Sequence, residues 1–135
     1  MSGTRLWIVV ATVLTSAVLA GQDKGVKASN AWVKLPAAGE TGTMAFVTVE
    51  NPGMYEANVT SAKADVAGKV EMREAGQAVT FITVPAYGRV DMSPAGVHLA
   101  LLELKQPIKE GDAVTLTLST DSDITLTVAA RVRKE

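Results

Sequence analysis

The chain of 135 residues contains no cysteine and a single histidine, His98. Without cysteine there is no disulfide, no thiolate nucleophile and no cysteine-ligated metal site, so the folded state must rest on packing. A single histidine also excludes zinc sites built from histidine pairs. No Gly-x-Ser-x-Gly motif accompanies the histidine, so an esterase-type triad is not indicated. The sequence therefore predicts a binding protein, not an enzyme.

The sequence also has few aromatic residues and a net charge close to zero. Phe, Trp and Tyr make up 4% of the chain, too little for a surface that stacks bases or sugars. The 13 basic and 14 acidic residues leave a formal net charge of −1, which provides no electrostatic footprint for nucleic acid or an anionic membrane. Neither nucleic acid nor a membrane is expected as a partner of the mature protein.

The longest apolar run lies at the N-terminus. Residues 6–20 (LWIVVATVLTSAVLA) carry no charge and follow Arg5. The run is short for a membrane span and ends in small residues, so it predicts a secretory signal peptide over residues 1–20, cleaved after Ala20. The alternative is an uncleaved N-terminal anchor. Because no cysteine follows the run, a lipoprotein anchor is not expected, and the mature protein is predicted to be periplasmic.

Behind a short linker, residues 21–26, the pattern has a period of two. Segments such as 43–50, 113–119 and 124–128 alternate apolar residues with threonine or other small residues, which is typical of antiparallel sheet. Gly- and Pro-containing turns separate the segments. Together they predict about nine strands, near residues 27–34, 43–50, 57–65, 68–74, 78–84, 87–92, 97–104, 112–120 and 123–133.

These strands predict an all-β sandwich with Greek-key connections in one domain, residues 27–135. Beyond the signal segment, no window of ten residues shows helical spacing. The basic end, residues 131–134, is expected to form an exposed edge strand or a tail, because alternating charges protect sheet edges.

Four segments in order resemble the periplasmic copper chaperones called PCu(A)C: residues 26–36 (VKASNAWVKLP), 43–52, 67–74 (AGKVEMRE) and 90–112. The most specific string is Leu-Lys-Gln-Pro at 104–107. The resemblance implies a cupredoxin-like antiparallel sandwich, in agreement with the strand count. It also implies copper(I) as the bound metal, and delivery to an acceptor such as an oxidase copper-site assembly protein.

The resemblance further implies a copper(I) site made of histidine and methionine, whose soft thioether suits this soft ion. The first ligand position falls on Arg73, and the last two fall on His98 and Ala100. The middle methionine has no counterpart, because no methionine lies between Met72 and Met92. His98 is thus the one ligand that remains of four.

Met72 is the substitute ligand that the sequence offers, so His98 and Met72 are the candidate metal residues. Strand alternation points Met72 away from the face of the neighbouring ligand position, and a bulge or a one-residue register shift would bring it round. Met92 is expected to pack in the core. Met44 and Met54 are expected to be core filler, the usual role of scattered methionines.

His98 and Arg73 also have structural interpretations that involve no metal. His98 fits a half-buried strand histidine bonded to a carbonyl or a carboxylate. Arg73 and Glu71 could form an ion pair that fills the former metal site. Alternatively, Arg73 and His98 could form a small anion pocket. The leading functional hypothesis is a periplasmic copper(I)-binding, chaperone-like protein with a degenerate site. The alternative is a metal-free β-sandwich of the same descent that binds proteins or small ligands.

Overall fold

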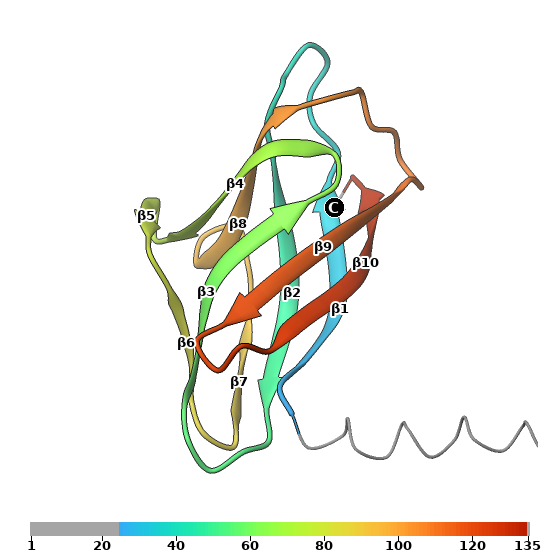
Figure 1. The fold of residues 1–135 in the computed structure, drawn as a ribbon. Coiled ribbons are helices and arrows are strands. Elements are labelled where there is room, and N and C mark those ends of the chain that lie inside the picture. Colours follow the sequence, from blue (N-terminus) through green and yellow to red (C-terminus); the bar gives the residue numbers. More distant parts are fainter. Residues whose placement is uncertain (1–24, 135) are drawn as a thin grey trace, which may run out of the picture.

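The computed structural model of the protein describes residues 25–134, which form ten strands and no helix (Figure 1). The strands are β1 (Lys27–Lys34), β2 (Thr43–Asn51), β3 (Ala57–Ala64), β4 (Ala67–Glu74), β5 (Gln77–Val79), β6 (Ile82–Val84), β7 (Gly88–Asp91), β8 (Val97–Leu104), β9 (Ala113–Thr120) and β10 (Thr125–Arg133). The all-β prediction is confirmed. The strand predicted over 78–84 is two short strands, β5 and β6. The predicted signal peptide, residues 1–20, lies outside the described residues.

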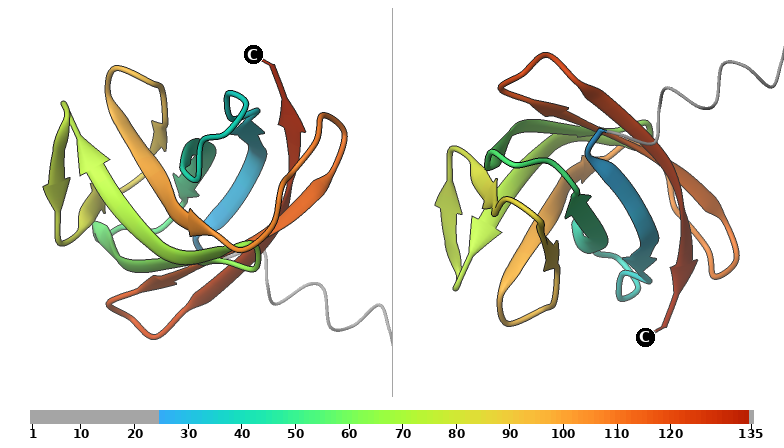
Figure 2. Two further views of the ribbon diagram at one scale, coloured as in Figure 1. Left: turned by 90° about the horizontal axis from the view of Figure 1, so that it is seen from above. Right: turned by 90° about the horizontal axis from the view of Figure 1, so that it is seen from below.

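One continuous sheet contains all ten strands, in the order β5-β4-β8-β2-β1-β10-β9-β3-β6, with β7 paired to β2. The sheet curls into a nearly closed barrel (Figure 2). The pair β1–β10 is parallel and the other pairs are antiparallel. The prediction of an edge strand at the basic end was wrong, because β10 lies between β1 and β9. Within residues 25–134, no helix is present that is long and apolar enough to cross a membrane.

The inward face of the sheet forms an aliphatic core. Every second residue of a strand points inward, which explains the alternation of apolar and small or polar residues in the sequence. The most deeply buried aliphatic residues include Val33, Ala45, Val47, Val49, Val59, Val84, Leu99, Leu101, Val114, Leu116, Leu118, Ala130 and Val132. With no disulfide available, burial of these side chains is the main source of stability.

A β-bulge in β1 decides which face Trp32 occupies. The pairing with β2 shifts by one residue between Ser29 and Trp32, and Asn30 there has a positive φ of 49°. A one-residue shift exchanges the two faces of a strand. Trp32 is therefore opposite Phe46, on the outside of the barrel, while Val33 points into the core opposite Ala45.

The turn between β9 and β10 is tied to β3 by a carboxylate. Asp121 accepts hydrogen bonds from the Asn58 side-chain amide (2.9 Å) and from the Asn58 backbone N–H (3.2 Å). Both bonds favour the ionised carboxyl, so they lower the pKa of Asp121 below its usual value.

This shift predicts a small loss of stability in acid. Because the folded-state pKa lies below the unfolded one, the contribution is complete above about pH 4 and is lost as the pH falls through the folded-state pKa. We expect Asp121→Asn to lower the urea midpoint more at pH 7 than at pH 2.5. Asp123→Asn in the same turn serves as the control. An equal deficit for Asp121→Asn at both pH values would contradict the assignment.

Candidate metal site

His98 lies near the start of β8, on the outer face of the barrel, and its residue is only 7% exposed. Its Nδ1 is 3.2 Å from the backbone oxygen of Gly96. Because a carbonyl oxygen can only accept, Nδ1 carries a proton, and the lone pair of the neutral ring is on Nε2. The expected hydrogen bond to a carbonyl is confirmed. The same bond orients many metal-binding histidines, because it leaves the second nitrogen free to coordinate.

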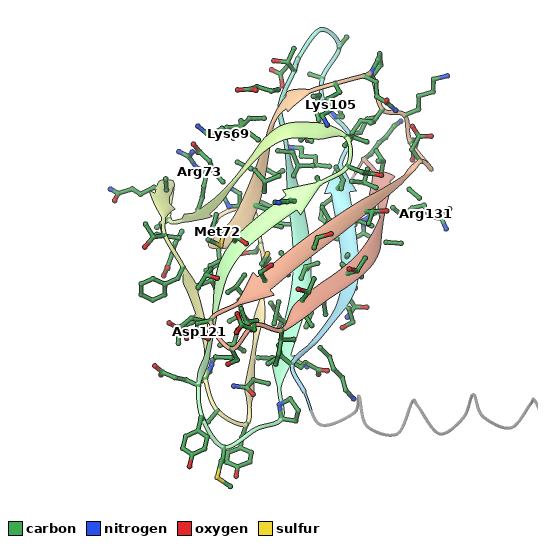
Figure 3. All side chains as sticks on the ribbon, viewed as in Figure 1. Lys69, Met72, Arg73, Lys105, Asp121 and Arg131 are labelled. Atoms are coloured by element: carbon green, nitrogen blue, oxygen red, sulfur yellow. The ribbon has the colours of Figure 1, made fainter. Side chains whose placement is uncertain are left out.

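Met72 and His98, the two predicted ligands, lie on opposite faces of the sheet. In the β4–β8 pair, Arg73 is opposite His98 and Met72 is opposite Leu99, with no bulge between Ala67 and Glu74. Met72 is 7% exposed and belongs to the aliphatic core. In Figure 3, Met72 points into the barrel and Arg73 points away from it. The register shift that a shared site requires does not occur, so the structure does not bring Met72 and His98 together.

Arg73 occupies the place beside His98 that the resemblance assigns to a metal ligand. Its Nη1 is 2.7 Å from Oε1 of Glu71, and its Nη2 donates to the Gly76 oxygen at 3.2 Å. Lys69 approaches the other Glu71 oxygen at 3.5 Å. The predicted Glu71–Arg73 ion pair is confirmed. A guanidinium cannot coordinate a cation, so this position repels a metal, although Glu71 compensates part of its charge.

Aromatic rings cover the other side of His98. The centroids of the Phe46 and His98 rings are 6.2 Å apart, and those of Trp32 and Phe46 are 4.6 Å apart. The Arg133 guanidinium lies 4.2 Å from the Trp32 ring centroid, in a cation–π contact. Arg133, Trp32, Phe46, His98 and Arg73 thus form a row across β10, β1, β2, β8 and β4 on the outer face. It buries Phe46 almost completely and shields the imidazole from water on that side.

Two residues beyond His98, Ala100 takes the last ligand position. It is flanked directly by Glu71 on β4 and by Met44 on β2. Met44 is half-buried on the outer face and is not part of the core, so the expectation that it fills the core was wrong. Met54 is 63% exposed and does not fill the core either. Met92 packs against the core as predicted.

Sequence reasoning missed Met44 because its neighbours come from a strand more than fifty residues away. The pairing of segments 43–51 and 97–104 would have revealed it. Within residues 25–134, no cluster of three or more His, Cys, Asp or Glu side chains is placed to hold a metal ion.

A family model described as "Putative lipoprotein LpqE-like" matches residues 26–132. The chain belongs to the LpqE-like family. A relative named "Putative lipoprotein Lxx21020", from Leifsonia xyli subsp. xyli (strain CTCB07), is 32% identical over 121 residues, which are 83% of this chain and 72% of that protein.

Solved structures of PCuAC domains share the fold of this LpqE-like chain. The copper-bound PCuAC domain from PmoF2 superposes with a TM-score of 0.75 at 24% identity, over 82% of this chain and 93% of that domain. The copper(I) form of DR1885 from Deinococcus radiodurans superposes with a TM-score of 0.70 at 26% identity, over 82% of this chain and 77% of that one. The predicted cupredoxin-like fold and the resemblance to PCu(A)C are confirmed.

Proposed function

We propose that this LpqE-like chain is a periplasmic copper(I)-binding, chaperone-like protein with a reduced ligand set, and that it acts as a binder and not as an enzyme. The observation that carries the proposal is the His98 imidazole. Gly96 holds its Nδ1, and among residues 25–134 no hydrogen-bond partner contacts its Nε2. This free nitrogen lies on the outer face of a fold whose relatives include copper-bound domains.

The chemistry of the site favours copper(I) over harder ions. Imidazole and thioether are neutral ligands, and the thioether is soft, which suits copper(I). A site with few ligands on the outside of the barrel can pass its ion to an acceptor without unfolding. The acceptor that we propose is a protein that assembles the copper site of an oxidase.

Export fits this role. The predicted signal peptide over residues 1–20 directs the protein to the periplasm, and the family model and the curated relative are both named as lipoproteins.

A copper(I) titration against a chromogenic chelator, without oxygen, tests the proposal. We expect His98→Ala to weaken copper(I) binding at least a hundredfold, which is about 2.7 kcal/mol, because it removes the nitrogen ligand. Met54→Leu is the control, since Met54 is exposed and lies outside the site. Circular dichroism checks that both variants are folded.

Two results would overturn the copper proposal. One is wild-type binding no tighter than the micromolar range, about −8 kcal/mol. The other is copper(I) binding that His98→Ala does not change. The first result would favour the metal-free alternative, in which Arg73 and Glu71 have replaced the metal and the sandwich binds proteins or small ligands. The second would mean that the ion binds at a site without His98.

A further inference from the structure

We infer that Met44 supplies the thioether that completes the copper(I) site of His98. The inference rests on the proposed function and identifies the second ligand of the same site. In this site the sulfur ligand comes from the neighbouring strand β2, because Ala100 takes the ligand position on β8. No motif for metal binding singles out Met44 in the sequence.

The register of β2 and β8 places Met44 beside His98. Met44 is directly opposite Ala100, so both side chains share the outer face of the barrel. His98 is two residues from Ala100 on that same face, which makes Met44 and His98 diagonal neighbours. Diagonal residues in an antiparallel pair are roughly 7 to 8 Å apart, within reach of long side chains.

Ala100 places only a small side chain between the two candidate ligands, and at 8% exposure it is covered by its neighbours. Its side chain is a single methyl group, whereas Met44 is long, unbranched and flexible about three bonds. The Met44 thioether can therefore lie over Ala100 and approach Nε2 of His98. The neighbouring Phe46 ring closes the site on the side of β2, because it stands 6.2 Å from the His98 ring.

The other described methionines are badly placed for this role. Met72 points into the core opposite Leu99. Met54 lies in the exposed connection after β2, and Met92 packs against the core after β7. Met44 is thus the described methionine that the strand pairing places on the face of His98.

The ligand set favours copper(I) over zinc, because the carboxylate of the nearby Glu71 is already occupied. Glu71 is directly opposite Ala100 on β4, but Arg73 and Lys69 hold its carboxylate. A site with one imidazole, one thioether and an occupied carboxylate offers little to zinc, which prefers tetrahedral sites of several nitrogen, sulfur or oxygen ligands. We therefore expect copper(I) to bind far more tightly than zinc.

The test combines affinity with a signal from the sulfur itself. In protein labelled with ¹³C at the methionine methyl groups, copper(I) should shift the Met44 resonance and leave those of Met54 and Met72 in place. Met44→Leu keeps the volume of the side chain but removes the sulfur, and should weaken copper(I) binding about tenfold or more, near 1.4 kcal/mol. Met72→Leu is the matched control and should bind as the wild type does.

The outcomes separate this inference from the proposed function. If His98→Ala abolishes binding while Met44→Leu has no effect and the Met44 methyl does not shift, the ligand is another group and the inference is wrong. If the wild-type protein does not bind copper(I), the proposed function fails and the inference fails with it. A copper-induced shift of Met44 together with weaker binding by Met44→Leu supports both.

Discussion

Replacing Arg73 by methionine should raise the copper(I) affinity of the protein about a hundredfold, or 2.7 kcal/mol. Arg73 is directly opposite His98 on the neighbouring strand, so a methionine there places a thioether beside the imidazole. The change also removes a positive charge. Two unit charges about 4 Å apart repel by roughly 1 kcal/mol in water and roughly 4 kcal/mol at an effective dielectric constant of 20, and Glu71 offsets part of this repulsion.

Two further variants separate the charge from the sulfur. Arg73→Leu removes the charge alone and should give a smaller gain, about tenfold, or 1.4 kcal/mol. Arg73→Lys keeps the charge and should give none. The titration with a competing chelator measures all three. Equal affinities for Arg73→Met and Arg73→Leu would show that a sulfur at this position does not reach the ion.

The second large effect concerns stability. Leu101→Ala should lower the free energy of unfolding by about 3 to 4 kcal/mol, because Leu101 is fully buried and its loss leaves a cavity in the core. Leu102→Ala, on the same strand but half-buried on the outer face, should cost only about 1 kcal/mol, since less apolar surface returns to water.

Urea unfolding of the two leucine variants measures the difference. A domain of this size has a stability of about 5 to 15 kcal/mol, so Leu101→Ala removes a large part of it. The pair also tests which face of β8 carries His98, because His98 and Leu102 are four positions apart and so lie on the same face. If both variants lost the same stability, the division of β8 into a core face and an outer face would be incorrect.

Much of the fold was predictable because its signals are local. The alternation of side chains and the turns between the strands predicted β1 over 27–34 and β8 over 97–104, and the structure has both. The resemblance placed Arg73 beside His98, and the strand register agrees. Strand propensity and turn chemistry depend on a few neighbouring residues, which a single sequence displays.

The remaining features depend on pairings between distant segments. Met44 meets Ala100, and Trp32 pairs in parallel with Arg131, across separations that no local pattern encodes. The basic end was therefore misplaced at an edge, and Met44 was overlooked. The hypothesis for Met72 required a register shift in β4, whereas the observed shifts lie in β1 at Asn30 and in β3 between Val59 and Ser61. A bulge of one residue exchanges two faces, so its position decides which side chains meet.

The most direct test uses the fact that the chain has one histidine. In protein labelled with ¹⁵N at the histidine ring, every imidazole signal belongs to His98. We predict that one equivalent of copper(I), without oxygen, shifts the Nε2 resonance strongly and leaves Nδ1 protonated and bonded to Gly96. Unchanged Nε2 and Nδ1 resonances in the presence of copper(I) would contradict a copper site at His98.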